Sequence, residues 1–364
     1  MFNFIPLEYY TPIYYNLQLL LVLLVFLKSN TQKIDSKNSK KFLNNISFLL
    51  LIVSIIYIGF RPISGRYFTD MASYAASFER YQMNETVDFN GDVLFNFFMK
   101  FCSSVMTVEV FFLVCAMLYI LPLWFACKKW FSSYSSYAFI ILVTSFSFWA
   151  YGTNGIRNGI ATSLFVYALS RDNMVFKLLF IAIAIGTHNS LFIPTAALAI
   201  TYVYNKPKAY FYGWLLAIPI SLVSGGFWEA LFAGLIEDDR VSYLTEGNVN
   251  NDDFSSTGFR WDFVIYSAAA VYSAYFFIFK KKFVDETYNR LVGVYLISNA
   301  FWILVIRANF SNRFAYLSWF MMGIIIVYPF LTKIQIKQQN KVLGLILLAY
   351  FGFTYVMNVI LVKE

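Results

Sequence analysis

The only histidine in the chain is His188, in the polar segment 186–190 between two apolar runs. An imidazole takes up a proton near neutral pH, so a histidine at a helix junction is well suited to act as a general base. A lone histidine can also be an ordinary polar residue whose hydrogen bonds are satisfied. We interpret His188 as a catalytic candidate because ionisable groups at membrane depth usually belong to functional sites.

A second polar segment, 151–159, contains Arg157, Asn154, Asn158 and three glycines. Glycine lets the backbone approach a ligand closely, and the N-terminus of the helix expected here favours an anion. The alternative is a tight turn whose arginine extends to the membrane interface. We expect Arg157 to bind an anion, because the segment is more polar than a turn requires.

A third segment, 61–74, combines Arg61, Arg66, Asp70 and Tyr74. On a helix, Asp70 and Tyr74 share one face, and Arg66 lies one turn earlier. An ion pair between Arg66 and Asp70 is one interpretation. The other makes Asp70 a second candidate base, or the group that orients the base.

Two later arginines, Arg260 and Arg313, stand at the start of apolar runs. Asp262 follows Arg260 so closely that a local ion pair is an alternative to ligand binding. Tyr316 lies three residues after Arg313, on the same face of a helix. Planar guanidinium groups bind phosphate oxygens in a bidentate manner, so these arginines are candidates for a diphosphate site.

The elements that must position these groups are membrane helices. Hydrophobic residues make up 59% of the 364 residues, and charged residues only 13%, whereas soluble domains contain about 25% charged residues. The apolar runs are nearly continuous, which favours helices over a closed barrel. No basic run adjoins a base-stacking platform, which argues against nucleic acid. The three cysteines are isolated and lack metal-ligand spacing, so we expect reduced packing residues and no metal site.

About twelve runs are candidate membrane spans, several of them shorter than the ~20 residues of a full crossing. They are residues 12–27, 42–60, 108–127, 134–150, 155–170, 174–186, 189–204, 210–224, 263–279, 291–306, 314–331 and 342–361. The runs 174–186 and 189–204 could instead form one tilted helix. The sequence therefore predicts a single all-α polytopic membrane domain over residues 1–364.

Charges divide unequally between the two faces of such a bundle. One face collects 18 cations and four acids, for a net charge of +14, and the other collects 10 cations and 16 acids, for −6. The positive-inside rule places the lysine-rich face in the cytoplasm and both termini outside. The outer face carries eight arginines and two larger segments, 61–106 and 225–261. The first of these includes an expected interfacial helix at 93–101.

Taken in order, four short motifs resemble the EpsG-type family of polysaccharide polymerases, relatives of the Wzy O-antigen polymerases. The motifs are Arg61 before Thr69-Asp70-x-x-x-Tyr74, then Gly155-Ile156-Arg157-Asn158-Gly159-Ile160-Ala161, Thr187-His188-Asn189-Ser190, and Asn312-Arg313-Phe314-Ala315-Tyr316. Phe68 stands where the family often has glycine, so either Arg61 or Arg66 matches the arginine of the first motif.

The resemblance implies a glycosyltransferase of GT-C-like architecture in the bacterial inner membrane, acting in O-antigen or lipopolysaccharide biosynthesis. It would transfer a growing glycan from undecaprenyl diphosphate onto a lipid-linked repeat unit at the periplasmic face. No cofactor or metal is then required, because the diphosphate activates the donor; a chain-length regulator protein is one conceivable partner. His188 or Asp70 would act as the base. The diphosphate would be bound by Arg61, Arg66, Arg157, Arg260 and Arg313, and the sugars by Tyr74, Asn154, Asn158, Asp262 and Tyr316.

Two other functions suit a polytopic protein with charges at membrane depth. A lipid-linked oligosaccharide flippase would also use arginines, but along a cavity that extends to both faces. A membrane acyltransferase would use a histidine, but commonly with an acyl donor that enters from the cytoplasm. The expected clustering of charges on one face argues against the flippase, and the expected outer position of His188 argues against the acyltransferase.

Overall fold

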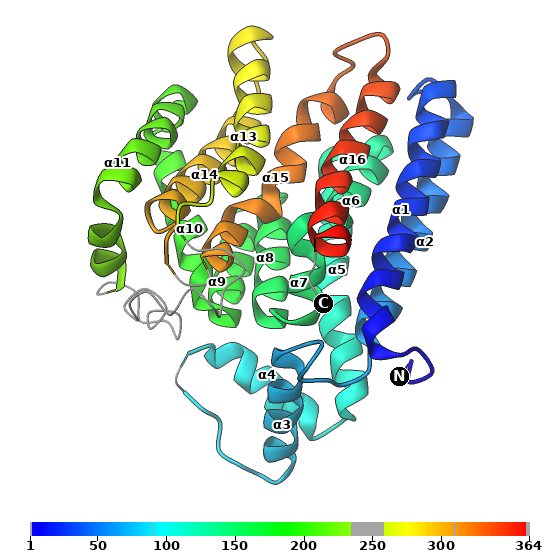
Figure 1. Ribbon diagram of the computed structural model, residues 1–364, viewed down its shortest axis with the longest axis vertical. Coiled ribbons are helices and arrows are strands. Elements are labelled where there is room, and N and C mark those ends of the chain that lie inside the picture. The colour runs from blue at the N-terminus through cyan, green and yellow to red at the C-terminus, as the bar shows by residue number, and fades with distance from the viewer. Residues whose placement is uncertain (1, 90, 234–257, 309–310, 362–364) are drawn as a thin grey trace. The chain divides into compact units, whose positions relative to one another are not determined.

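The computed structural model describes residues 2–89, 91–233, 258–308 and 311–361 (Figure 1). Every regular element within these ranges is a helix, which confirms the predicted all-α class. The chain divides into two compact units. The first combines Met1–His188 with Phe330–Glu364, and the second is Asn189–Pro329.

The first unit contains the helices that carry most of the predicted site residues. They are α1 (Leu7–Thr31), α2 (Lys37–Gly59), α3 (Asp70–Gln82), α4 (Val93–Ser103), α5 (Val108–Phe131), η1 (Ser132–Tyr134), α6 (Ser135–Val143), α7 (Phe146–Thr153), α8 (Ile156–Leu169), α9 (Met174–Thr187), α16 (Gln339–Tyr355) and η4 (Val356–Ile360). Helix α8 packs against both α5 and α9, α2 packs against α5, and α1 packs against α16. The shorter α3 and α4 lie together beyond the end of α2, near the N-terminus of the chain (Figure 1).

The second unit is built around α14. Its elements are η2 (Asn189–Leu191), α10 (Phe192–Val203), α11 (Pro207–Ala233), α13 (Trp261–Tyr275), η3 (Phe276–Lys280), α14 (Glu286–Leu304) and α15 (Asn312–Thr332), of which the last three residues of α15 belong to the first unit. Helices α10, α11 and α13 all pack against α14. The fully buried Asn299 accepts a hydrogen bond from Trp214 at 2.7 Å and donates to Ser318 at 2.9 Å and to Ser267 at 3.1 Å. Such satisfied polar contacts link helices where the surroundings are apolar.

Several helices begin where a side chain accepts a backbone N–H that the helix itself cannot pair. Ser36 accepts from the backbone of Ser39 at the start of α2, 3.1 Å away. Asn173 accepts from the first turn of α9, and Asp285 accepts from Tyr288 at 2.8 Å at the start of α14. These caps fix where three of the apolar helices begin.

Among the described residues, six helical stretches are long and apolar enough to cross a membrane. They are Leu7–Thr31, Lys37–Gly59, Val108–Val143, Trp261–Lys280, Asn312–Thr332 and Gln339–Ile360. The structure also places helices at the other predicted spans, but these are short, divided or less apolar. The chain is a multi-pass membrane protein, whereas twelve crossings and a GT-C-like architecture stay predictions.

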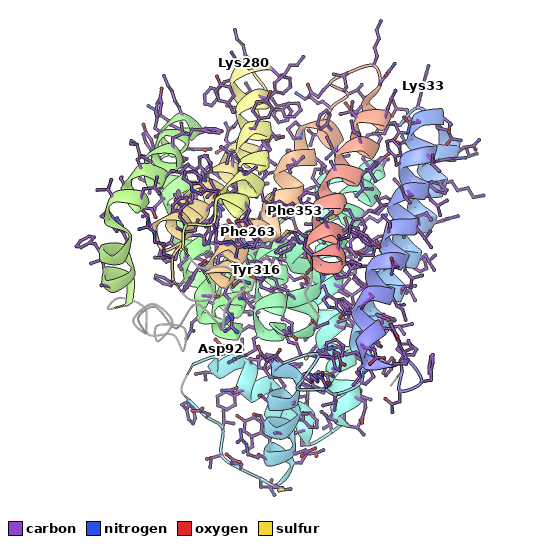
Figure 2. The ribbon with its side chains drawn as sticks, in the orientation of Figure 1. Lys33, Asp92, Phe263, Lys280, Tyr316 and Phe353 are labelled. Atoms are coloured by element: carbon purple, nitrogen blue, oxygen red, sulfur yellow. The ribbon has the colours of Figure 1, made fainter. Side chains whose placement is uncertain are left out.

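The predicted outer segments differ in how much the structure describes. In the first, α4 forms where the sequence predicts a helix at 93–101, although its interfacial position stays a prediction. The second, 225–261, falls largely on residues 234–257, which lie outside the described residues. Within the first unit, Asp92 and Lys33 lie at opposite ends (Figure 2), whereas the compartment that each end faces stays a prediction.

The runs 174–186 and 189–204 form two helices rather than one. Helix α9 ends at Thr187, and His188 has an extended backbone with φ −156° and ψ 118°. The chain resumes helical structure with η2 and α10. The break places a histidine side chain at a helix end instead of within a continuous helix.

Candidate active site

Asp92 joins two of the predicted site residues, Arg157 and His188, within the first unit. Its Oδ2 atom lies 2.8 Å from Nη1 of Arg157. Its Oδ1 atom lies 2.8 Å from Nδ1 of His188. The side chains of Asp92 and His188 are 5% and 7% exposed, whereas that of Arg157 is 32% exposed. A ligand can therefore contact the Arg157 guanidinium, whereas the Asp92 carboxylate that pairs with it is buried.

Each of the three side chains stands at a helix end. Asp92 directly precedes α4, Arg157 is the second residue of α8, and His188 directly follows α9. The helix dipole favours a carboxylate at a helix start and an imidazolium at a helix end, but it disfavours an arginine at a start. The side chain of Asp92 does not cap α4, although its backbone carbonyl accepts a hydrogen bond from the backbone of Asn96 at 3.1 Å. Its carboxylate instead offsets the unfavourable position of Arg157.

Close packing of α4 on α9 brings Asp92 to His188. A Cβ atom on Gly186 would lie 3.3 Å from two carbons of the Leu94 side chain, which is already tight. Gly186 and Leu94 each stand two residues from the bonded pair. Glycine at position 186 therefore allows the approach of the two helices on which the Asp92–His188 contact depends.

The hydrogen bond between Asp92 and His188 selects the tautomer of the ring. An ionised carboxylate only accepts hydrogen bonds, so Nδ1 of His188 is the donor. In the neutral ring the proton acceptor is then Nε2. A carboxylate placed in this way orients an imidazole and stabilises its protonated form. The arrangement is chemically suited to general base catalysis through Nε2.

Tyr74 extends the cluster from α3. Nε of Arg157 donates to the Tyr74 hydroxyl at 3.2 Å, and the guanidinium carbon lies 5.6 Å from the centre of the ring. The Tyr74 ring also meets Phe95 of α4 edge-on at 5.8 Å. Burial raises the pKa of Tyr74, so its hydroxyl keeps its proton. Tyr74 thus fixes the orientation of the Arg157 side chain.

Arg61 is fully enclosed rather than open to a ligand, with an exposed fraction of 1%. Nη1 donates to the carbonyl of Ile58 at 2.5 Å, and Nη2 donates to the carbonyl of Thr153 at 2.8 Å. Burial lowers the pKa of Arg61 to about 10, which still leaves it charged at neutral pH. The guanidinium thus connects the end of α2 to the end of α7. Its contact in α7, Thr153, directly precedes Asn154.

Asn154 and Asn158 flank Arg157 on the turn and on the first part of α8. Both have a buried side-chain oxygen with no hydrogen-bond partner among the described residues. Asn158 is 4% exposed. A buried amide oxygen without a partner is costly, which marks these two positions as suitable for a hydroxyl-bearing ligand.

Arg66 and Asp70, the remaining predicted residues of the first unit, do not form an ion pair in the described structure. Arg66 is exposed and lies over the Tyr67 ring at 5.6 Å. Asp70 is the half-buried first residue of α3, one turn from Tyr74. Its charge acts on Tyr74, but no hydrogen bond or ion pair among the described residues joins it to Asp92, Arg157 or His188, so its role as a base stays a prediction.

Four predicted residues lie in the second unit. Arg260 and Asp262 form the local ion pair that the sequence offered as an alternative, with Nε to Oδ1 at 3.0 Å and Nη2 to Oδ2 at 2.6 Å. Arg313 is half-buried in the first turn of α15. The Tyr316 ring lies 5.7 Å from that of Trp319. Their contribution to a ligand site stays a prediction.

Sequence reasoning did not identify Asp92. The residue directly precedes the helix predicted at 93–101, and an aspartate in that position is normally interpreted as a helix cap. The available signal was its place on the same expected face as Arg157 and His188. Spacing along the chain could not show that Asp92 contacts Arg157 and His188, which are 65 and 96 residues away in the sequence.

Comparison with known proteins adds one match. A model of the EpsG family matches residues 49–364, which is most of the chain and includes every predicted site residue. No curated protein matches the chain, and no solved structure does. The family match indicates a polysaccharide polymerase-like membrane protein. Nothing in these comparisons supports the flippase alternative.

Proposed function

The chain belongs to the EpsG family, and on that premise we propose that it is a glycosyltransferase that extends a polysaccharide outside the cytoplasm. The donor is a growing glycan on undecaprenyl diphosphate. The acceptor is a sugar hydroxyl of a lipid-linked repeat unit, and the reaction takes place at the periplasmic face of the bacterial inner membrane. The lysine-rich loops support this orientation through the positive-inside rule.

The observation that carries the proposal is the bridge from Asp92 to both Arg157 and His188. It combines a proton acceptor with a cation in one cluster. Glycosyl transfer from a lipid diphosphate needs both, because the acceptor loses a proton while the leaving group gains negative charge.

The proposed step balances without a further reactant. Nε2 of His188 accepts the proton of the acceptor hydroxyl as its oxygen bonds to the anomeric carbon of the donor. The bond between that carbon and the diphosphate oxygen breaks, and the electron pair leaves with the undecaprenyl diphosphate. Arg157 stabilises this charge, and Asp92 stabilises the imidazolium that forms on His188.

We assign supporting roles to the neighbouring side chains. Tyr74 positions Arg157, and the unpartnered amide oxygens of Asn154 and Asn158 accept hydrogen bonds from sugar hydroxyls. Arg66, Arg260 and Arg313 remain candidates for contacts with the lipid diphosphate, Asp262 and Tyr316 for contacts with the sugars. A chain-length regulator is a candidate partner.

The proposal is tested by complementing a polymerase-null strain and reading the glycan ladder on a gel. His188→Ala should slow polymerisation by roughly 10²- to 10⁴-fold, which is the usual contribution of a general base. Arg157→Lys keeps the charge but loses the planar fork, and should cost roughly 100-fold or more. Both variants should leave single repeat units in place of long chains.

Arg80→Lys is the matched control, because it makes the same arginine-to-lysine change at a residue that pairs at the surface with Glu85, 3.5 Å away. It should give wild-type ladders. Expression of each variant is measured in the membrane fraction, so that lost polymer is not confused with lost protein. Full ladders from both His188→Ala and Arg157→Lys at normal expression would refute the proposed site.

A further inference from the structure

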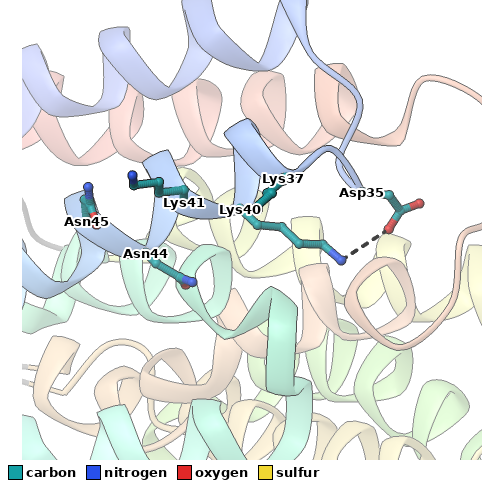
Figure 3. Close-up of a pocket in the computed structure, with 6 residues that line it drawn as sticks. All are labelled: Asp35, Lys37, Lys40, Lys41, Asn44 and Asn45. Carbon is teal, nitrogen blue, oxygen red and sulfur yellow. Dashed lines mark ion pairs between the residues drawn. The ribbon is translucent and has the colours of Figure 1, made fainter.

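A hollow of about 520 Å³ opens beside the first two turns of α2, and none of its lining residues belongs to the Asp92 cluster. All the residues that line it are polar or charged (Figure 3). They are Asp35, Lys37, Lys40, Lys41, Asn44 and Asn45. The five that belong to α2 recur at helical spacing, so they form one face of that helix.

The hollow carries a positive charge that no described residue neutralises. Asp35 is its only acid; it lies 3.8 Å from Nζ of Lys40 and accepts a hydrogen bond from the Tyr134 hydroxyl. Lys37 and Lys41 are exposed and form no ion pair in the described structure. Three lysines against one aspartate leave a net charge of +2. The first turn of α2 contains no acidic residue, so its backbone N–H groups add to the attraction for an anion.

The positive surface continues into a neighbouring hollow of about 370 Å³ that shares Asp35. Its lining includes three further lysines, Lys33, Lys337 and Lys341. Neither hollow contains an arginine. This end of the first unit therefore offers ammonium groups, which act as hydrated point charges, rather than bidentate forks.

Along α2, the charged face leads directly into an exposed apolar stripe. Lys41 and Asn45 are followed at intervals of three or four residues by Leu49, Ile52 and Ile56, and Phe48 lies beside Leu49. The exposed fractions are 57% for Phe48, 55% for Leu49, 41% for Ile52 and 39% for Ile56. In a helix long and apolar enough to span a membrane, such a stripe faces hydrocarbon. The cationic hollow and the apolar stripe thus lie on the same face of α2.

We propose that the hollow beside α2 binds the headgroup of an anionic phospholipid. The phosphate lies against Lys37, Lys40 and Lys41, headgroup hydroxyls contact Asn44 and Asn45, and an acyl chain follows Leu49, Ile52 and Ile56. Juxtamembrane lysines attract anionic lipids, and the hollow adds a defined place for the headgroup. The apolar stripe favours a lipid over a free phosphate, because a free phosphate has no acyl chain to contact it.

The test uses the full-length protein purified in detergent, with binding followed by native mass spectrometry and by the shift of the thermal unfolding midpoint. Phosphatidylglycerol, phosphatidylethanolamine and inorganic phosphate are titrated separately. Phosphatidylglycerol should bind and raise the midpoint. The double variant K37Q/K41Q should bind it about tenfold more weakly, because each lysine near the surface contributes to the attraction.

Two further double variants make the result specific. K37R/K41R preserves the charge and should retain most of the binding, which shows that substitution itself does not disturb α2. K280Q/K281Q removes the same charge from exposed lysines at the end of α13 and η3, and should bind phosphatidylglycerol as the wild type does.

The outcomes separate the sources of the anion. An equal loss in K280Q/K281Q would reduce the effect to general charge attraction and overturn the proposal. Inorganic phosphate that stabilises the protein as strongly as phosphatidylglycerol would show an anion site without a lipid, and equal binding of phosphatidylethanolamine would show an acyl-chain site without charge selection. Either result would also overturn it.

Discussion

A carboxylate on a side chain that is only 5% exposed is stable only when its charge is paired, and Asp92 is paired twice. Taking a charge out of water costs several kcal/mol, which close partners must offset. Arg157 supplies a charge-assisted bond, and His188 supplies a second donor. At the scale of single residues, Asp92 therefore orients His188 and, together with Tyr74, orients Arg157.

Replacement of Asp92 by asparagine should destabilise the first unit and abolish polymerisation. The amide presents N–H groups toward donors that need an acceptor, and it leaves the Arg157 charge without its partner. Breaking a buried pair in this way typically costs about 3–5 kcal/mol. Thermal unfolding of the purified variant and the glycan ladder measure the two effects.

Glu85→Gln is the control for Asp92→Asn, since Glu85 pairs with Arg80 in the same outer segment but is 52% exposed. Exposed pairs contribute at most about 1 kcal/mol, so this variant should behave as wild type. Wild-type stability and ladders in Asp92→Asn would contradict the buried bridge.

Arg61 offers a test that separates a structural role from ligand binding. Arg61→Lys replaces a fork that donates to two carbonyls by one ammonium, and the Thr153 or Ile58 carbonyl loses its donor. An unpaired buried acceptor costs about 1–3 kcal/mol. We expect a lower unfolding midpoint, with activity reduced only in proportion to the folded protein. Normal stability with lost activity would instead support the diphosphate contact predicted from the sequence.

At the scale of elements, close helix packing sets the geometry of the cluster. A Cβ atom on Gly159 of α8 would lie 2.6 Å from the backbone carbonyl oxygen of Tyr151 in α7. Backbone atoms at that distance cannot give way without a shift of the helix. The approach of α7 to α8 therefore depends on glycine, and it places the turn that leads into Arg157.

Gly159→Ala should accordingly separate α7 from α8, lower the unfolding midpoint and reduce polymerisation. Gly213→Ala in α11 is the matched control, because a Cβ atom there meets nothing within 4 Å. Alanine is favoured over glycine in a helix by about 1 kcal/mol, so the control should be neutral or stabilising. Equal behaviour of the two variants would show that the close approach is unimportant.

At the scale of the whole molecule, the orientation in the membrane governs which reaction is available. Lys33 and Asp92 lie at opposite ends of the first unit (Figure 2), so we expect these two ends to face different compartments. The positive-inside rule assigns the lysines to the cytoplasm. Our proposal therefore requires lipid-linked substrates on the outer side.

The labelling of single introduced cysteines can measure this orientation. The native Cys102, Cys115 and Cys127 are all buried, so they should contribute little labelling of their own. A membrane-impermeant maleimide applied to spheroplasts should label Ser104→Cys, which is exposed after α4, and should not label Lys33→Cys. Permeabilised cells, in which both positions should react, provide the control. The opposite labelling pattern would place the Asp92 cluster in the cytoplasm.

Much of the candidate site could be predicted because its residues are costly in a membrane. His188, Arg157 and Tyr74 each stand out as polar groups at the ends of apolar runs, and the structure joins them. Asp92 could not be found in this way, because an aspartate before a helix has an ordinary explanation as a cap. Arg61 carried the same sequence signal as Arg157 yet lies enclosed among backbone carbonyls.

Composition and periodicity by themselves determined the all-α membrane class, the places of the helices and the polar segments between them, because transfer to lipid penalises every exposed backbone and charged group. Which polar groups meet was decided only by tertiary packing. The contacts of α4 with α9, and of α8 with its neighbours, bring together side chains that are 65 to 96 positions apart in the chain, from Asp92 with Arg157 to Asp92 with His188. Local sequence carries no record of that proximity, because it arises from how apolar faces fit against one another.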